Sequence, residues 1–228
     1  LAFMPYVSGY ADHFNDETPN TPNWTGQVNG GMDIKLGLNE AFTLDMTLVP
    51  DFGQVVFDNQ VLNLTPFEIQ FNENRQFFTE GTELFNKSGL FYSRRIGIQA
   101  PSKVLTTLLD STEYLTNVPS SSQLYNASKV SGRTKKGLGI GVFNAITAEQ
   151  KAKAVNQVTN VERDVLISPL TNYNVLVLDQ NLKNNSYLTF TNTYVWRAGS
   201  FYDATVTCLD SKFNTKDNNY GFSAWGIL

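Results

Sequence analysis

Apolar and polar residues alternate along much of this chain with the period of two that is typical of half-buried strands. The alternation is clearest over residues 32–48, where it is interrupted only near Asn39 and Glu40. The apolar positions are Met32, Ile34, Leu36, Leu38, Phe42, Leu44, Met46 and Leu48. Between them lie Asp33, Lys35, Gly37, Thr43, Asp45 and Thr47. The pattern predicts a β-hairpin with one apolar face and one polar, partly charged face.

The charges on the polar face predict how the two strands of this hairpin pair. Pairing Asp33 with Asp45 would set two like charges against each other, which is unfavourable. Shifting the register by one pair sets Lys35 against Asp45 and leaves residues 39–41 as a three-residue loop, a common hairpin length. We therefore predict a cross-strand pair between Lys35 and Asp45.

Seven further segments have strand-like patterns, which brings the predicted number of strands to nine. They are residues 1–10, 124–131, 137–145, 171–179, 186–197, 203–209 and 220–225. Residues 11–27 are predicted to form a loop, and residues 132–136 and 180–185 are predicted to form short turns. Residues 146–169 are predicted to be a long polar connection with a short helix near residues 147–156.

Strands of this length, apolar on one face and joined by alternately short and long connections, are typical of a transmembrane antiparallel β-barrel. Closing the sheet leaves no backbone group unpaired in lipid. Tyr194 and Trp196 would suit an aromatic girdle at the membrane interface. Because bacterial barrels normally have an even number of strands, we expect residues 1–228 to be the N-terminal part of a larger barrel, incomplete at its C-terminal end. The alternative fold is a soluble carbohydrate-binding β-sandwich, whose strands also alternate.

Residues 50–123, called the insert below, interrupt the strand pattern. Residues 49–97 have no sustained period and are dense in aromatic and acidic residues. A long irregular segment within a folded domain is usually a functional loop, so we expect the insert to plug or cover the barrel lumen. Its candidate residues are Asp51, Asp58, Glu68, Glu73, Arg75, Phe77, Phe78, Glu80, Arg94 and Arg95. The residues predicted to face the lumen beside it are Lys35, Asp45, Gly137, Gly139 and Gly141.

Composition excludes several classes of site. The net charge is −4, which gives no electrostatic footprint for nucleic acid. His13 is the only histidine and Cys208 the only cysteine, so an internal disulfide, a cysteine zinc cluster and any site that needs two histidines are excluded. We expect no metal and no cofactor. No run of 18 apolar residues predicts a transmembrane helix.

Several segments together resemble one protein family. Residues 50–85 and 90–97 are similar to the central signature of domain-of-unknown-function family 5916 (DUF5916), and residues 126–134, 137–150 and 169–180 are similar to the segments that follow it. The resemblance implies an outer-membrane β-barrel of a Gram-negative bacterium, in a family whose members are often preceded by a domain similar to carbohydrate-binding module family 9. It also implies outer-membrane lipid as a partner, with other outer-membrane proteins or a glycan as further candidates.

Three functions are consistent with the sequence. The first is an outer-membrane barrel that handles or passes an outer-surface substrate, or serves as a structural subunit of an outer-membrane assembly. The second is a glycan hydrolase that uses carboxylates of the insert, which requires two carboxyl groups about 5 to 10 Å apart. The third is the soluble carbohydrate-binding sandwich. We expect the acidic residues of the insert to pair with Arg75, Arg94, Arg95 and backbone amides, and we assign no catalytic residue.

Overall fold

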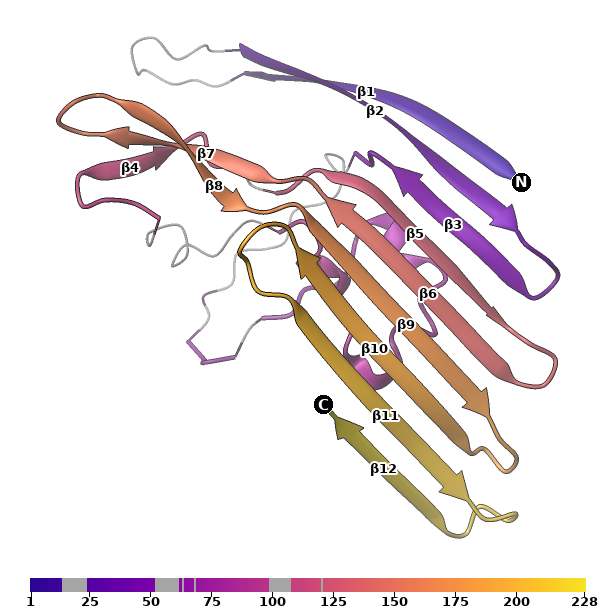
Figure 1. Ribbon diagram of the computed structural model, residues 1–228. Helices are drawn as coiled ribbons and strands as arrows, with labels where there is room; N and C mark the ends of the chain where they lie inside the picture. Colours follow the sequence, from indigo (N-terminus) through magenta and orange to yellow (C-terminus); the bar gives the residue numbers. More distant parts are fainter. Residues whose placement is uncertain (14–23, 52–61, 63, 68, 99–107, 120) are drawn as a thin grey trace.

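The computed structural model describes residues 1–13, 24–51, 62, 64–67, 69–98, 108–119 and 121–228. Nine strands of this part form one antiparallel sheet, the main sheet (Figure 1). In spatial order they are β1 (Ala2–His13), β2 (Trp24–Gly37), β3 (Phe42–Leu48), β5 (Leu124–Arg133), β6 (Leu138–Thr147), β9 (Thr171–Asn181), β10 (Tyr187–Arg197), β11 (Ala204–Asn214) and β12 (Gly221–Ile227). The prediction of an all-β, antiparallel fold is confirmed, and each of the nine predicted strands corresponds to one strand of this sheet.

The predicted pairing of the first hairpin is also confirmed. Lys35 lies opposite Asp45, and Asp33 lies opposite Thr47. The loop closes with the backbone N–H of Leu38 donating to the carbonyl oxygen of Phe42 over 2.9 Å. The side chain of Asn39 accepts hydrogen bonds from the backbone N–H groups of Ala41 and Phe42, which satisfies the turn.

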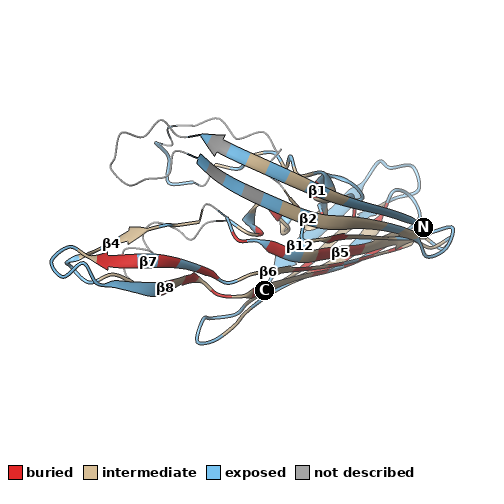
Figure 2. Ribbon diagram, turned by 90° about the horizontal axis from the view of Figure 1, so that it is seen from above, coloured by how far each residue is buried: buried red, intermediate tan, exposed pale blue. Residues whose placement is uncertain are grey.

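A second, three-stranded sheet lies beyond one end of the main sheet (Figure 2). It contains β4 (Glu113–Thr116), β7 (Gln150–Asn156) and β8 (Glu162–Ser168), in the order β4-β7-β8. Since β7 follows β6 after two residues and β8 precedes β9 by two, the β7–β8 hairpin continues the β6–β9 pair. The side chain of Arg163 donates to Glu113 over 2.6 Å and lowers the pKa of that carboxyl to about 2, which ties β4 to β8.

Two expectations about secondary structure are wrong. Residues 146–169, expected to be a long polar connection with a short helix near residues 147–156, instead contain β7 and β8. In β7, Lys151 and Lys153 are exposed while Ala152 and Ala154 are buried. Ala and Lys favour helices, but burial of the alanine face overrides that propensity. Ala152 and Ala154 form a small core with Val165 and Ile167, and Leu108, Leu109, Leu115 and Val118 pack against it. The loop expected over residues 11–27 is shorter, because β1 extends to His13 and β2 begins at Trp24.

The main sheet curves around the insert (Figures 1 and 2). The face that carries the insert is called the inner face, and the opposite one the outer face. The described strands do not close into a barrel, since β1 and β12 each have a strand neighbour on one side only. The described part of the insert contains α1 (Gln76–Thr79), η1 (Lys87–Gly89) and η2 (Ser93–Arg95), and it also provides β4 of the second sheet. Among the described residues, no helix is long and apolar enough to span a membrane.

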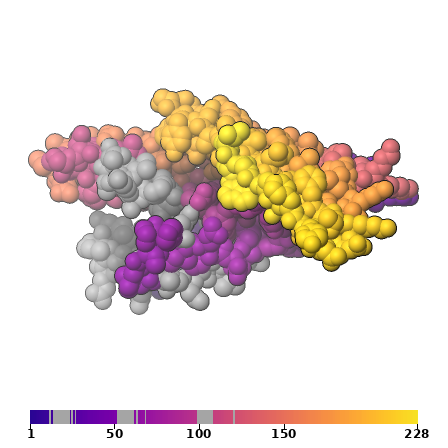
Figure 3. Space-filling view, turned by 90° about the horizontal axis from the view of Figure 1, so that it is seen from below, coloured from indigo at the N-terminus to yellow at the C-terminus, as the bar shows by residue number. Residues whose placement is uncertain are grey.

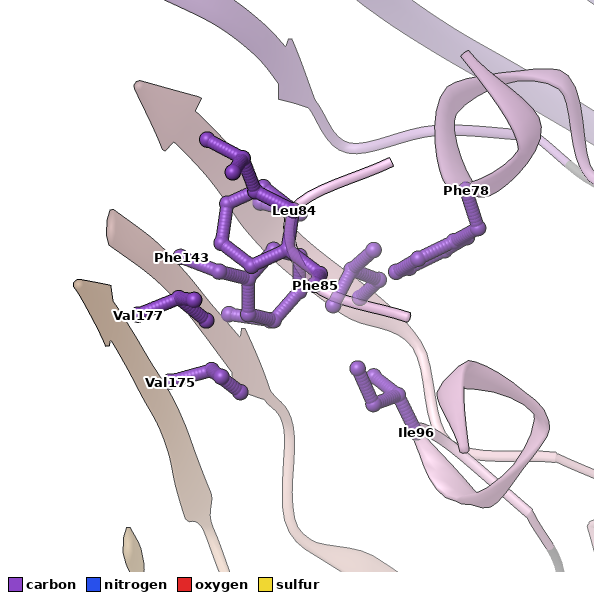
Figure 4. Close-up of a cluster of buried hydrophobic side chains, with 10 residues drawn as sticks. Phe78, Leu84, Phe85, Ile96, Phe143, Val175 and Val177 are labelled. Carbon is purple, nitrogen blue, oxygen red and sulfur yellow. The ribbon is translucent and has the colours of Figure 1, made fainter. Parts of the chain in front are cut away.

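The largest hydrophobic core lies between the insert and the inner face. Phe78, Leu84, Phe85 and Ile96 of the insert point toward Phe143, Val175 and Val177 of the sheet (Figure 4). Phe85 is fully buried, and its ring lies 6.1 Å from that of Phe143. The insert therefore provides one half of the core, in which Phe78 and Phe85 are buried, whereas Phe67 of the insert is exposed.

Two glycines of β6 make room for this packing. A Cβ atom on Gly139 would lie 2.8 Å from Leu84, and one on Gly141 would lie 3.1 Å from the Phe85 ring. Gly137 has a different role, because it lies in the turn before β6 with a φ of +85°. Such a backbone conformation favours glycine.

We expect Gly141→Val to lower the free energy of unfolding by about 1–3 kcal/mol, because the added methyl groups would overpack the Phe85 contact. Gly9→Val is the matched control, since a Cβ atom there meets nothing within 4 Å, and it should change stability by less than about 0.5 kcal/mol. Denaturant unfolding of both variants measures the difference. Equal effects would show that the close approach of the insert to β6 is unimportant for stability.

Candidate functional site

The insert is attached to the inner face by a buried lysine. Lys129 on β5 is 2% exposed, and its ammonium group donates hydrogen bonds to the carbonyl oxygens of Phe77 and Glu80. These carbonyls belong to α1 and the residue that follows it. The same ammonium group lies 4.4 Å from the centre of the Phe77 ring and 4.0 Å from the Asp45 carboxylate. Lys129 thus provides hydrogen-bond donors for two carbonyl groups of the insert from a buried position on the sheet.

A buried carboxylate forms the second attachment. Asp179 on β9 is fully buried and accepts hydrogen bonds from Lys87 of η1 over 2.8 Å and from Thr189 of β10 over 2.6 Å. Arg133 of β5 also binds this carboxylate. Two cations and a hydroxyl group therefore compensate one desolvated anion. The cluster joins three strands of the main sheet, β5, β9 and β10, to the insert.

The predicted Lys35–Asp45 pair reaches the insert as well. Lys35 lies 3.8 Å from Asp45 and donates to Glu80 of the insert over 3.2 Å. Hydrogen bonds from Gln76 and from Lys35 lower the pKa of Glu80. The cavity beside these residues has a volume of only about 70 Å³, far smaller than a typical ligand site. We therefore assign these charges to attachment of the insert.

Glu73 and Arg75 hold the insert in its own fold. The Arg75 guanidinium donates to both carboxylate oxygens of Glu73, at 2.9 and 2.8 Å, and to the carbonyl oxygens of Ser93 and Ile96, at 2.7 and 3.0 Å. It also lies 4.2 Å from the centre of the Phe78 ring. Burial alone would raise the pKa of Glu73, but hydrogen bonds from Arg75 and Ser93 bring it below its ordinary value. This network of hydrogen bonds holds the start of α1 against the segment around η2.

The other sequence-predicted residues are dispersed. Asp51 accepts hydrogen bonds from Ser8 and from Tyr10 of β1, so it lies far along the sheet from the Asp179 cluster. Phe77 and Phe78 pack edge to face at the inner face. Arg94 and Arg95 form η2 with Ser93. Asp58 and Glu68 lie outside the described residues.

Three of the candidate carboxylates, Asp51, Glu73 and Glu80, lie in the described part of the insert and are bound at separate places. Asp51, Glu73 and Glu80 each bind different partners, on β1, within the insert and on β2 respectively. A glycosidase needs two carboxyl groups placed on either side of one sugar ring, so the geometry does not favour the hydrolase hypothesis.

Four residues that attach the insert to the inner face were not among the sequence-predicted candidates. They are Lys87 of the insert itself and Lys129, Arg133 and Asp179 of the main sheet. The alternating pattern of the strands could have identified three of them. Lys129 and Arg133 lie on the same strand face as the buried Ala127. Asp179 lies on the same face as the buried Val175 and Val177. A charge in phase with buried apolar residues indicates a buried partner.

Comparison with known families gives one match. The model of the family described as Domain of unknown function (DUF5916) matches residues 1–226. No curated protein and no solved structure matches the chain.

We expect Glu73→Gln to destabilise the fold by about 1–3 kcal/mol, because it leaves the half-buried Arg75 guanidinium without its carboxylate. Glu83→Gln is the matched control, since Glu83 is exposed, and it should have little effect. Chemical unfolding at pH 7 measures both.

The same contact predicts a pH dependence. The folded-state pKa of Glu73 is lowered, so its stabilising contribution is fully present above the unfolded-state pKa of about 4.3 and is lost as the pH falls through the folded-state value. The stability difference between the native protein and Glu73→Gln should therefore shrink as the pH falls below about 4. A difference independent of pH would contradict this role for the Glu73 charge.

Proposed function

We propose a membrane function for this chain, which belongs to the DUF5916 family: its main sheet is part of the wall of an outer-membrane β-barrel, and the insert is the plug of that barrel. The observation that carries the proposal is the difference between the two faces of the sheet. The inner face carries the buried charges and the insert, whereas the outer face is mostly apolar and uncovered.

The outer face has the composition of a lipid-facing surface over several neighbouring strands. Val142, Leu176, Leu178, Leu188 and Leu209 point outward from β6, β9, β10 and β11, and each is 38–52% exposed. They lie beside one another in the sheet, since Val142 pairs with Leu176 and Ile140 pairs with Leu178. A continuous apolar surface of this kind is unfavourable in water but costs nothing against hydrocarbon.

Polar groups border this apolar surface toward the three-stranded sheet. The Asn144 side chain donates to Asn172 over 2.6 Å and to Asn174 over 2.8 Å, and Asn192 donates to Thr207 over 2.8 Å. Because these amides satisfy one another, they suit the boundary between hydrocarbon and headgroups. Tyr194 and Trp196 of β10 lie beyond them on the same face, as expected for an aromatic girdle.

The connections support an orientation. The β2–β3, β5–β6, β9–β10 and β11–β12 turns are short and lie at one end of the sheet, whereas the insert and the three-stranded sheet leave from the other end (Figure 1). Outer-membrane barrels have short periplasmic turns and longer extracellular loops. We infer that the three-stranded sheet lies outside the cell and that further strands complete the barrel between β12 and β1.

The insert suits a plug because of where its contacts lie. It enters after β3 at the end with the long connections, and Leu84 reaches Gly139, which pairs with Arg133 close to the short β5–β6 turn. In the space-filling view, the purple residues of the insert lie along one side of the strands (Figure 3). A plugged barrel of this kind handles or passes an outer-surface substrate when the plug moves, or serves as a closed structural subunit.

We expect Leu44→Arg to destabilise the protein in lipid by about 2–4 kcal/mol, because Leu44 is on the outer face. Thr43→Arg is the matched control, since Thr43 is an exposed residue of the same strand on the other face, and it should be tolerated. Folding of the full-length protein into lipid vesicles measures the cost, and fractionation should place the native protein in the outer membrane. A chain that stays folded in water without detergent would contradict the proposal.

We expect replacement of residues 69–98 by a Gly-Ser linker to raise the conductance of the full-length protein in planar bilayers, because this segment occupies the inner face. The control replaces residues 157–160, in the exposed turn between β7 and β8, and should leave conductance unchanged. An unchanged conductance after the first replacement would show that the insert is not a plug.

A further inference from the structure

A cavity of about 510 Å³ lies between the insert and the inner face, at the end with the long connections. Its walls come from residues 90–98 of the insert, from β9, β10 and β11, and from the connection between β10 and β11. The junction of β8 and β9, at Ser168 and Pro169, closes another side. This volume lies within the range of small-molecule sites. The cavity is separate from the ionic attachments of Lys129 and Asp179.

The wall on the side of the insert is rigid. Arg75 binds the carbonyl oxygens of Ser93 and Ile96, and the backbone N–H of Ser122 donates to the carbonyl oxygen of Gly97 over 2.8 Å. The side chain of Ile96 is 3% exposed and belongs to the core. A wall fixed in this way is preformed, so a ligand would not have to order it on binding.

Most of the lining is apolar and aromatic. The rings come from Phe91 and Tyr92 of the insert, Tyr173 of β9, and Phe201 and Tyr202 of the β10–β11 connection. Aromatic walls with a few polar groups are typical of sites for compounds with a flat or hydrophobic body.

The charges of the lining have one sign. Arg95 and Arg197 line the cavity, and no acidic residue is among its described lining residues. Arg197 is oriented by a hydrogen bond to the carbonyl oxygen of Tyr202 over 2.8 Å, and its guanidinium lies 5.1 Å from the Tyr202 ring centre. The nearby Asp203 accepts hydrogen bonds from the backbone N–H of Arg197 and from the outward-facing Tyr194. Guanidinium groups bind carboxylate, sulfate and phosphate well.

We propose that this cavity is a binding site for a small organic anion, with the aromatic or other apolar body of the ligand against the ring-lined wall and its acidic group at Arg197. This inference does not depend on the proposed membrane function, because binding at the cavity requires only the fold described above.

The test measures binding of three naphthalene probes to the full-length protein by isothermal titration calorimetry. The probes are naphthalene-2-carboxylate, the neutral 2-naphthamide and the cationic 2-naphthylmethylammonium. The carboxylate should bind at least about tenfold more tightly than the other two, since one charge-assisted hydrogen bond is worth about that factor or more. Equal affinity for all three probes, or binding of none, would overturn the proposal.

Two pairs of variants locate the binding. Arg197→Gln should weaken the carboxylate about tenfold or more and leave the amide unchanged, whereas Lys183→Gln, which removes a charge in the β9–β10 turn, should change neither. Thr193 on β10 also lines the cavity. Thr193→Asp should abolish carboxylate binding and favour the ammonium probe, whereas Thr193→Asn should not.

Thr193→Asp keeps the test decisive if Arg197→Gln fails to fold. Carboxylate binding unaffected by Thr193→Asp would show that the anion binds elsewhere. Conductance and fractionation play no part in these measurements, so a failure here leaves the plug proposal standing, and a failure of the plug proposal leaves the binding site standing.

Discussion

The irregular backbone of the insert can be buried only if its polar groups find partners, and the rest of the structure follows from this constraint. An unpaired carbonyl group away from water is costly. The main sheet provides these partners through side chains rather than through another strand. Lys129 donates hydrogen bonds to two carbonyl oxygens at α1. The glycines of β6 then allow Leu84 and Phe85 to approach the sheet closely. Hydrogen bonding to the backbone of the insert and close packing of its side chains thus occur at neighbouring positions on the sheet.

Breaking the buried charge cluster around Asp179 costs more free energy than the intact cluster contributes to folding. Asp179 is compensated by Lys87, Arg133 and Thr189, so the assembled cluster is tolerated in a dry site. Removing one cation would leave the carboxylate partly uncompensated, which costs far more than the intact cluster contributes. The cluster therefore specifies where the insert binds more than it adds to overall stability.

The sequence was most informative where the determining physics is local. The pairing of Lys35 with Asp45 depends on two charges and one loop length, all within residues 32–48, and the structure agrees.

The second sheet was missed because β7 is rich in good helix formers, and only pairing with β4 and β8 selects the strand. The carboxylates of the insert drew attention to its own chemistry, whereas the wall residues Lys129 and Asp179 carry the attachment. Their partners are distant in sequence, so spacing could indicate burial but not identity.

The continuity of β6 with β7, and of β8 with β9, makes one long antiparallel ribbon out of two sheets. Its far part bears the exposed turn near residues 157–160, and its near part bears Phe143 and Asp179, two of the main contacts of the insert. The exposed turn and the strands that hold the insert therefore belong to the same two stretches of backbone, and only two residues separate β6 from β7 and β8 from β9.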